Sequence, residues 1–328
     1  MYIIANKAPM GQHGRGTCMK KVFIDGSAGT TGLRIFDRLH ERTDIQLLTL
    51  PEAERKLEAS RKRMLNEADV VFLCLPDDAA REAASWVENP DTVVLDTSTA
   101  HRTAPGWCYG FPELSPVQEA KLRRAKRIAV PGCHASGFIA LVYPLVSAGL
   151  LAPDVLLSCY SLTGYSGGGK KMIAEYRAPE RSYLLNAPRQ YALGQTHKHL
   201  KEMKAVAGLA NEPVFCPVVA DFYSGMQVTV PLFSSWLAPG AGMEDVKNAY
   251  KALYTGPVVS CTDAADEGGF LSAAAQSGLD SMKITVTGSE QRMLLLAVYD
   301  NLGKGASGAA VECMNLVTGA EKTLGLEL

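Results

Sequence analysis

The alternation of apolar and polar positions begins, at residue 20, with a strand, a glycine-rich turn and a helix. The run KKVFID predicts a strand, and LRIFDRLHER predicts a helix because its apolar side chains recur every three or four residues. The segment GSAGTTG lies between them, and IQLLTL predicts a second strand. This order predicts a βαβ unit, in which a helix joins two parallel strands.

Short, nearly continuous apolar runs follow this unit. They cover residues 68–76, 92–98 and 127–132, and predicted helical segments at 59–65 and 78–88 lie among them. Parallel strands that are covered on both faces have this composition. We therefore expect residues 20–132 to form an α/β domain with a Rossmann-like, doubly wound parallel sheet.

The pattern changes after Cys133. A long apolar segment, FIALVYPLVSAGLL, predicts a helix, and later alternating runs, among them MQVTVPLF, MKITVTG and QRMLLLAVYD, predict a largely antiparallel sheet. These features indicate a second, α+β domain over residues 133–303. The C-terminal segment 304–322 has helical spacing, and we expect it to pack back on the first domain.

The first 19 residues have no sustained period and precede a second methionine that leads directly into a strand. They lack the longer apolar stretch of a secretory signal, so we expect an unstructured extension that takes no part in the fold. An upstream start or an expression leader agrees with this composition as well as a targeting role does.

The charge balance narrows the class of partner. There are 33 Lys and Arg against 34 Asp and Glu, so the net charge of -1 gives no basic excess to attract nucleic acid or an acidic membrane. No apolar run approaches the roughly 20 residues that cross a bilayer. The eight cysteines are scattered without a CxxC motif, which is typical of reduced thiols. We therefore expect a cytoplasmic protein that binds small molecules.

The glycine-rich turn after the first strand is placed to bind a dinucleotide. It opens an amphipathic helix, and glycines there permit a tight turn and let backbone N–H groups approach a pyrophosphate. The alternative is a turn that serves only helix–strand packing. The residues of this turn that we expect at the cofactor are Gly26, Ser27, Gly29, Thr30, Thr31 and Gly32.

The residues after the second strand favour NADP over NAD. An NAD enzyme holds the ribose 2′-hydroxyl with an Asp or Glu at the end of this strand, but Leu50 stands there. Arg55 and Lys56 follow, and an arginine accommodates the 2′-phosphate of NADP. We therefore expect NADP as the cofactor, with Arg55 at its 2′-phosphate.

Cys133 lies between an apolar strand and a long apolar helix, at the helix N-terminus. The helix dipole and free N–H groups stabilise a thiolate there, so we expect a pKa of Cys133 lowered toward neutrality and N–H groups that hold an oxyanion. An isolated cysteine is more often a small buried residue. Together with a dinucleotide loop, however, the position predicts a nucleophile that forms a thiohemiacetal.

A proton carrier must accompany such a cysteine, and the segment THKHLKEM offers two histidines at a predicted helix start. Thr196 is placed to cap the helix, and Glu202, three residues after His199, to orient the His199 ring. We expect one of His197 and His199 to face the cysteine. A solvated charged turn is the alternative, and a metal site is disfavoured because the sequence lacks a third ligand cluster.

Seven motifs occur in order from about Met19 to the C-terminus. They are IDGSAGTTGLRI, CLPDDAAREA, DTSTAHR, VPGCHASGF, SGGGKKMI, THKHLKEM and NLGKGASGAA. Together they closely resemble the short type of N-acetyl-gamma-glutamyl-phosphate reductase. The resemblance implies an NADP-binding Rossmann domain joined to a catalytic domain like that of aspartate-semialdehyde dehydrogenase. It also implies that identical subunits associate through the catalytic domain.

The resemblance implies roles for single residues as well. It makes Cys133 the nucleophile and His199, supported by Glu202, the acid/base, with His197 as the alternate. It places Arg102 near the substrate phosphate, where a planar guanidinium can grip two oxygens at once. The further residues that we expect at the cofactor are Pro76, Ser166, Gly167, Gly168 and Asn301.

The activity implied is the NADPH-dependent reduction of N-acetyl-gamma-glutamyl phosphate to N-acetylglutamate semialdehyde, in arginine biosynthesis, through a Cys133 thioacyl intermediate. Three alternatives stay open: an aspartate-semialdehyde-type dehydrogenase, a nicotinamide-binding redox sensor with a reversibly oxidised cysteine, and a cysteine hydrolase. The HKH-x-x-E motif favours the acylglutamyl-phosphate enzymes over the semialdehyde dehydrogenases. Whether the acyl group is acetyl or carrier-linked stays open too.

Overall fold

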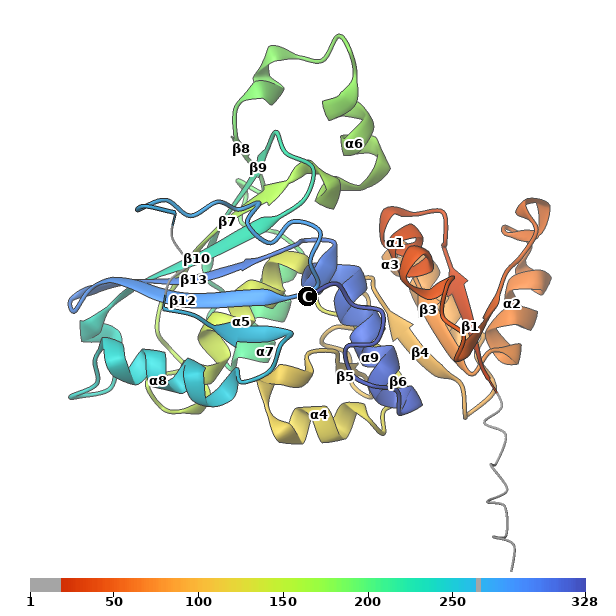
Figure 1. Cartoon of the computed structure of the whole chain (residues 1–328), viewed down its shortest axis with the longest axis horizontal. Helices are drawn as coiled ribbons and strands as arrows, with labels where there is room; N and C mark the ends of the chain where they lie inside the picture. Colours follow the sequence, from red (N-terminus) through yellow and green to blue (C-terminus); the bar gives the residue numbers. More distant parts are fainter. Residues whose placement is uncertain (1–18, 264–266) are drawn as a thin grey trace, which may run out of the picture.

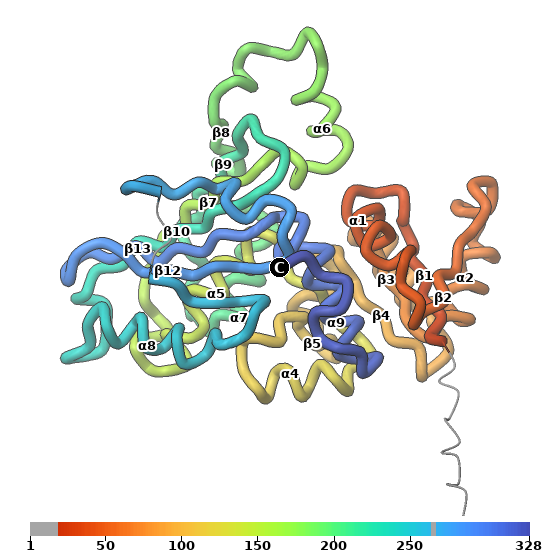
Figure 2. The backbone as a smooth tube through the Cα atoms, viewed as in Figure 1, coloured from red at the N-terminus to blue at the C-terminus, as the bar shows by residue number. Residues whose placement is uncertain are grey.

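Two β-sheets organise the chain (Figure 1). The computed structural model describes residues 19–263 and 267–328, so the predicted N-terminal extension, apart from Met19, lies outside the described residues. The chain runs through the first sheet, crosses to the second, and returns with its C-terminal helix to the first (Figure 2). None of the helices in these two ranges is long and apolar enough to cross a bilayer.

The first sheet is parallel throughout and confirms the predicted doubly wound fold. Its strands, in the spatial order β2-β1-β3-β4-β6-β5, are β2 (Ile45–Leu48), β1 (Lys20–Asp25), β3 (Val70–Leu73), β4 (Val93–Asp96), β6 (Arg127–Ala129) and β5 (Cys108–Tyr109). The sequence pattern did not predict β5, because two residues are too few to show a period.

Helices cover both faces of this sheet, as its buried strands require. On one face α1 (Thr30–Leu39), α4 (Pro116–Leu122) and α9 (Gly308–Thr318) share a core with the strands. On the other face α2 (Glu58–Glu67) and α3 (Asp77–Ser85) share a second core. The last helix of the chain therefore packs beside the first one, against strands that are about 200 residues earlier in sequence.

The second sheet is mixed and largely antiparallel. Its strands, in the order β11-β12-β13-β10-β7-β9-β8, are β11 (Val259–Cys261), β12 (Met282–Ser289), β13 (Arg292–Tyr299), β10 (Met226–Phe233), β7 (Ser158–Gly164), β9 (Val214–Ala220) and β8 (Arg189–Gln190). Only β11 with β12 and β7 with β9 pair in parallel among the described strands. The prediction of an α+β region with a mainly antiparallel sheet is confirmed.

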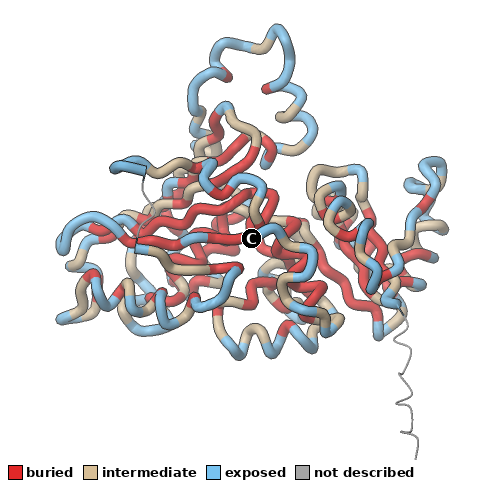
Figure 3. Tube along the Cα trace, viewed as in Figure 1, coloured by how far each residue is buried: buried red, intermediate tan, exposed pale blue. Residues whose placement is uncertain are grey.

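Three helices cover one face of the second sheet: α5 (Cys133–Ser147), α7 (His199–Ala207) and α8 (Met243–Leu253). A lobe that contains α6 (Gly169–Arg177) projects from the sheet and is mostly exposed, whereas the strands and α5 are mostly buried (Figure 3). Helix α5 is apolar all round because the sheet, α7 and α8 enclose it.

The interior of α5 contains Pro144, which has no backbone N–H to bond the carbonyl of Ala140 one turn earlier. The Tyr254 hydroxyl donates to that carbonyl at 2.8 Å, and the Tyr250 hydroxyl donates to the next one, Leu141, at 2.6 Å. Two side chains from the α8 region thus satisfy buried carbonyls and fix the helix whose first residue is Cys133.

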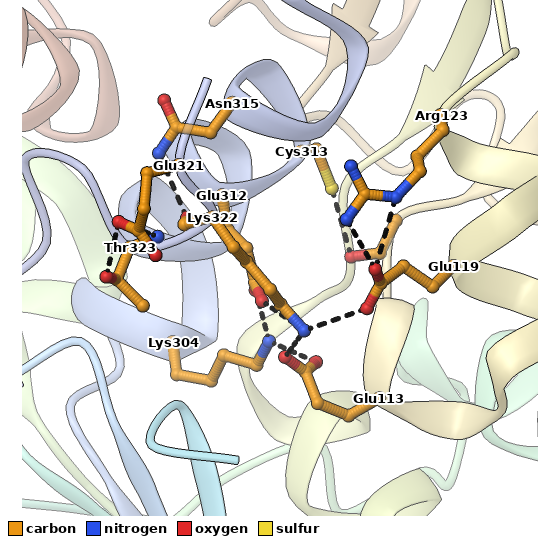
Figure 4. A network of polar contacts seen from close by, with 11 residues as sticks. Glu113, Glu119, Arg123, Lys304, Glu312, Cys313, Asn315, Glu321, Lys322 and Thr323 are labelled. Carbon is orange, nitrogen blue, oxygen red and sulfur yellow. Dashed lines mark hydrogen bonds and ion pairs between the residues drawn. The ribbon is translucent and has the colours of Figure 1, made fainter. Parts of the chain in front are cut away.

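A buried ionic cluster joins the C-terminal part of the chain to the first sheet (Figure 4). The Lys304 ammonium lies 2.7 Å from Glu113 and 2.5 Å from Glu312, and Lys322 lies 2.9 Å from Glu113. Lys304 belongs to the π-helical turn η6 (Gly303–Ser307), which precedes α9. The cluster therefore fixes this turn against the segment that follows β5.

Candidate active site

A cavity of about 310 Å³ lies between the two sheets. Both parts of the chain line it, since Thr30 belongs to α1 of the first sheet and Ser166 follows β7 of the second. The predicted site residues that line this cavity are Thr30, Thr31, Arg102, Cys133, Ser166, Gly167, Gly168, His197, His199 and Asn301.

Cys133 is the first residue of α5, which is the helix N-terminus predicted for it, and three residues separate it from strand β6. The side chain is partly buried, and burial raises the pKa of the Cys133 thiol although Arg102 and the His134 backbone N–H lower it. The expectation that the helix N-terminus lowers this pKa is therefore wrong. Loss of hydration around the sulfur outweighs the dipole and the hydrogen bond.

Gly132, directly before the cysteine, lets three side chains approach the backbone. A Cβ atom there would clash with a terminal nitrogen of Arg102 and would lie 2.5 Å from His199 Nε2 and 2.8 Å from Glu202 Oε2. These distances are below any ordinary contact of a Cβ atom, so only glycine fits. The sequence showed this glycine as part of a motif but gave no reason for it.

Glu202 is buried and bonds the N-terminus of α5. Its Oε1 accepts hydrogen bonds from the Gly132 N–H at 2.8 Å and from the Tyr109 hydroxyl at 2.7 Å, and Oε2 pairs with Arg102 at 3.0 Å. The expectation that Glu202 orients the His199 ring is wrong, because these three donors occupy its carboxylate. Sequence reasoning missed Tyr109, which stands in the two-residue strand β5.

His199 begins helix α7, and its ring is buried against the cavity. Its Nδ1 has no hydrogen-bond partner among the described residues. Burial, followed by the nearby Arg102 charge, lowers the pKa of His199 well below its ordinary value, so the ring is neutral. Helix α7 has Lys198 at its N-cap position and no side-chain cap, so the predicted capping by Thr196 is wrong.

His197 lies beside His199, with 4.7 Å between the ring centroids. Its Nδ1 accepts a hydrogen bond from the His199 backbone N–H at 3.2 Å. Burial, with the Lys198 charge, lowers the pKa of His197 to about 4. The structure therefore brings both predicted histidines to the cavity. Among the described residues, no group of three or more His, Cys, Asp or Glu side chains is arranged so that it could hold a metal ion.

A third histidine, His134, lines the same cavity, and sequence reasoning gave it no role. It bonds through Nδ1 to the Ser161 hydroxyl and through Nε2 to the Tyr191 hydroxyl, both at 2.6 Å. Burial lowers its pKa to about 3. Its position next to Cys133 was the one feature of the sequence that could have indicated a role in the site. Its two hydrogen-bond partners come from distant segments of the chain.

A larger cavity of about 780 Å³ lies at the carboxyl ends of β1 and β2, which is where sheets of this kind bind dinucleotides. The predicted residues Gly26, Ser27, Arg55 and Lys56 line it. Gly26 has φ +87°, and a Cβ atom there would collide with the Cys74 carbonyl, so the turn needs glycine. Helix α1 starts with Gly29 at its N-cap and no side-chain cap, which leaves backbone N–H groups for an anion.

Basic side chains surround the end of this cavity. Arg55 donates through Nε to the Leu50 carbonyl at 3.2 Å, which leaves its two terminal nitrogens for a phosphate. Arg61, which the sequence reasoning did not single out, pairs with the buried Asp25 at 2.8 Å and is therefore already neutralised. Lys170, from the second part of the chain, lines the same cavity.

The remaining predicted residues have mainly supporting positions. Asn301 donates through Nδ2 to the Ser166 hydroxyl at 2.9 Å, which joins two segments that were predicted to bind the cofactor. Gly29, Gly32 and Pro76 line neither of the two cavities. Gly32 packs against the backbone of Gly26, so packing, the alternative reading of the turn, accounts for this glycine.

Two family models match the chain. One describes the NAD-binding domain of semialdehyde dehydrogenases and matches residues 21–122, and the other describes their dimerisation domain and matches residues 133–301. The chain is 43% identical over 318 residues to N-acetyl-gamma-glutamyl-phosphate reductase of Trichormus variabilis, covering 93% of this chain and 99% of that protein. It is 45% identical over 307 residues to the reductase of Rhizobium meliloti, covering 92% and 99%.

Solved structures with the same fold are aspartate semialdehyde dehydrogenases. The enzyme II of Vibrio cholerae complexed with ASA has a TM-score of 0.71 at 18% identity, covering 92% of this chain and 99% of that one. The enzyme of Candida albicans with NADP has a TM-score of 0.65 at 17% identity, with the same coverage. At these identities the likeness concerns the fold alone.

Proposed function

The chain belongs to the N-acetyl-gamma-glutamyl-phosphate reductase family of the semialdehyde dehydrogenases, and we propose that Cys133 carries the acyl group in its reaction. That reaction is the NADPH-dependent reduction of N-acetyl-gamma-glutamyl phosphate to N-acetylglutamate semialdehyde, a step of arginine biosynthesis. The observation that supports this role best is the convergence of Cys133, His199 and Arg102 on one cavity around Gly132.

In this mechanism the Cys133 sulfur attacks the acyl carbon while the neutral His199 ring accepts the thiol proton. Because the pKa of His199 is lowered, the ring is neutral at neutral pH and has a free lone pair for this proton. A thioester forms, and phosphate leaves with the electron pair of the broken C–O bond and takes a proton from water. Backbone N–H groups at the start of α5 stabilise the tetrahedral oxyanion.

NADPH, when bound, supplies the hydride that reduces the thioester carbon. His199 then gives its proton to the thiohemiacetal oxygen, and this proton returns to sulfur as the C–S bond breaks. The aldehyde leaves, and Cys133 is again a thiol beside a neutral histidine. Glu202 takes no part in proton transfer in this proposal; it fixes Gly132 and Arg102 through its three hydrogen bonds.

In this proposal the residues of the glycine turn, which line both cavities, would hold the dinucleotide. Gly26 and Ser27 line the larger cavity, whereas Thr30 and Thr31 line the smaller one that contains Cys133. A cofactor that crosses the turn would therefore place its ribose phosphate near Arg55 and its nicotinamide near the cysteine. Residues 20–132 with the C-terminal segment 304–322 bind the cofactor, and residues 133–303 carry catalysis and association.

The protein forms a homo-oligomer through the second sheet in this proposal. The face of that sheet opposite α5, α7 and α8 exposes Tyr160, Val214 and Leu294 on three different strands. A second copy is the partner that the matched dimerisation domain indicates. We place the protein in the cytoplasm, because all seven cysteines in the described residues are free thiols.

Turnover with two aldehydes tests the function. The purified enzyme should reduce NADP in a phosphate-dependent reaction with N-acetylglutamate semialdehyde and should be far slower with aspartate semialdehyde. Cys133→Ser should bind NADP normally and have no measurable turnover, because an alcohol supplies no accessible anion at neutral pH. Equal rates with both aldehydes would contradict the substrate assignment, and an active serine variant would contradict the covalent mechanism.

A further inference from the structure

The cavity that contains Cys133 holds one positive charge without a counter-ion. Among the described residues that line this cavity, the basic side chains are Arg102 and Lys198, and no lining residue is Asp or Glu. We propose that Lys198 binds the phosphate group of the acyl phosphate, and inorganic phosphate in the reverse reaction. This proposal rests on the proposed function and adds the residue that recognises the leaving group.

Arg102 is the less available of the two cations. Its Nε donates to the Val130 carbonyl at 3.0 Å, and its terminal nitrogens donate to Glu202 at 3.0 Å and to the Thr97 carbonyl at 3.1 Å. The side chain is 7% exposed. Its charge is therefore balanced by Glu202, and a large part of its hydrogen-bonding capacity is already used.

Lys198 has neither of these restraints. Its residue is exposed, and no hydrogen bond or ion pair of its ammonium is present among the described residues. Asp77 is the acidic group whose charge interacts with it, but no ion pair joins the two, and the Asp77 carboxylate already accepts a hydrogen bond from the Thr99 N–H at 3.0 Å. Lys198 therefore keeps three donors and a full charge for a ligand.

The position of Lys198 in the chain brings this charge to the reacting group. It stands between His197 and His199, and both rings line the cavity with the cysteine. After burial, Arg102, the His134 N–H and Glu202, the Lys198 charge has a smaller effect on the pKa of Cys133 and lowers it, which agrees with its place in the lining of the same cavity. Because the histidines are neutral, Lys198 supplies the net charge that a phosphate dianion requires.

The substrate has two anionic groups, and the geometry favours the phosphate. The phosphate is bonded directly to the carbon that Cys133 attacks, so it must lie within the cavity that the cysteine and histidines line. The carboxylate is several bonds away along the glutamyl chain and can lie outside it. A strongly hydrated ammonium on a flexible stem is also a suitable partner for a group that enters and leaves in each cycle.

The test compares Lys198→Gln and Lys198→Arg with Lys201→Gln. Lys201 is a matched control, because it is exposed on the same helix but does not line the cavity. In the phosphate-dependent oxidation of N-acetylglutamate semialdehyde, Lys198→Gln should raise the KM for phosphate about 10- to 100-fold, the usual worth of a hydrogen bond to a charged group. The KM values for the aldehyde and for NADP should change less than about threefold, as expected for groups that Lys198 does not contact.

Lys198→Arg should keep the KM for phosphate within about threefold of the unchanged enzyme, since it retains the charge. Lys201→Gln should change none of the three constants. An unchanged KM for phosphate in Lys198→Gln would overturn the proposal. A rise in the KM for the aldehyde alone would overturn it as well and would assign Lys198 to the carboxylate.

A second measurement is independent of turnover. Inorganic phosphate should protect Cys133 from iodoacetamide in the unchanged enzyme and in Lys201→Gln, and should lose this effect in Lys198→Gln. If the unchanged enzyme shows no phosphate-dependent turnover with N-acetylglutamate semialdehyde, the proposed function fails. Protection that is equal in all variants would overturn the assignment of Lys198 even where the function holds.

Discussion

Three neutral histidines surround one cysteine in this site, and they differ in their hydrogen bonds. Both ring nitrogens of His134 have partners, and His197 accepts a hydrogen bond through Nδ1. His199 alone has an unpartnered buried Nδ1 among the described residues and an Nε2 next to Gly132. A ring that is not committed to neighbours can accept and return a proton, so the structure favours His199 as the acid/base.

Asparagine variants of two histidines test this distinction. His199→Asn should reduce kcat by roughly 10²- to 10⁴-fold, the usual worth of general acid–base catalysis, and His197→Asn should cost less than about tenfold. His40→Asn is a control, because His40 lies on the surface after α1. Steady-state kinetics measure all three, and a larger loss for His197→Asn would reverse the two roles.

The basic residues beyond β2 should decide which dinucleotide is bound. Replacing Arg55 and Lys56 with alanine should weaken the binding of NADPH about 10- to 100-fold and leave the binding of NADH almost unchanged, because the lost contact is with the 2′-phosphate. Arg63→Ala is the control, since Arg63 is exposed and does not line the cavity. Dissociation constants from nucleotide fluorescence measure this, and equal losses for the two cofactors would place these side chains elsewhere.

At the scale of elements, the start of α5 is the point that the rest of the site is built around. The helix N-terminus has no side-chain cap of its own, and Glu202 from α7 bonds the Gly132 N–H instead. Tyr299 from β13 donates its hydroxyl hydrogen to the Cys133 carbonyl at 2.5 Å and accepts the Gly137 N–H at 3.0 Å. Two elements, α7 and β13, therefore hold the backbone on both sides of the sulfur.

Gly132→Ala should disrupt this arrangement. The added methyl group would meet Arg102, His199 and Glu202, so these side chains must move. We expect a loss of kcat/KM greater than about 10²-fold, since a displacement of about 1 Å costs that much, with a loss of stability of about 1–3 kcal/mol. Gly256→Ala is the control, because a Cβ atom there meets nothing within 4 Å. Equal activity of the two variants would contradict the packing argument.

The ionic cluster at Lys304 fixes the turn that packs against Cys133. Gly305, its neighbour in the π-helical turn, lies against Cys133, since a Cβ atom there would be 3.1 Å from that of the cysteine. Lys304→Met would leave Glu113 and Glu312 buried without their main counter-ion, and we expect it to lower the free energy of unfolding by about 3–5 kcal/mol.

Urea unfolding of Lys304→Met should be compared with that of Lys62→Met. Lys62 forms an exposed i,i+4 pair with Glu58, and its loss should cost less than about 1 kcal/mol. Equal losses of unfolding free energy in the two variants would mean that the buried cluster stabilises the protein no more than a surface ion pair does.

At the scale of the whole molecule, folding removes ionisable side chains from water where the two sheets meet. Burial lowers the pKa of His134 to about 3, that of His197 to about 4, and that of His199 well below its usual range. The unfolded chain binds protons at these residues below about pH 6.5, whereas the folded protein does not. Stability must therefore rise with pH in this window and fall as the pH drops through it.

The free energy of unfolding should decrease between pH 6.5 and pH 5, and His134 alone should contribute a slope on the order of 1 kcal/mol per pH unit. Denaturant titrations at several pH values measure this slope. His134→Gln should reduce the slope and leave the rest of the pH dependence in place. A stability that is constant from pH 5 to pH 7 would show that these rings titrate in the folded protein as they do in the unfolded chain.

The sequence by itself determined the elements and the position of Cys133 at the start of a helix. Local periodicity predicts the strand–turn–helix pattern around Gly26, the parallel strands and the start of α5 at Cys133. The glycines of the turn add to this, because a backbone with positive φ, as at Gly26, favours glycine. The segment THKHLKEM was also expected to bring a histidine to the cysteine, and both of its histidines line the cavity with Cys133. Such features depend on residues that are close in the chain, so the pattern of side chains is enough to find them.

The tertiary structure decided which of these residues contact one another and which charges are free. Glu202 bonds Arg102 and Tyr109 across 100 and 93 residues of chain, and no spacing rule could select these partners over His199. Burial raised the pKa of Cys133 where the helix N-terminus alone predicted a decrease. Hydrogen-bond partners and hydration depend on every element packed around a group, so only the folded chain could show that Arg102 is neutralised while Lys198 keeps its charge.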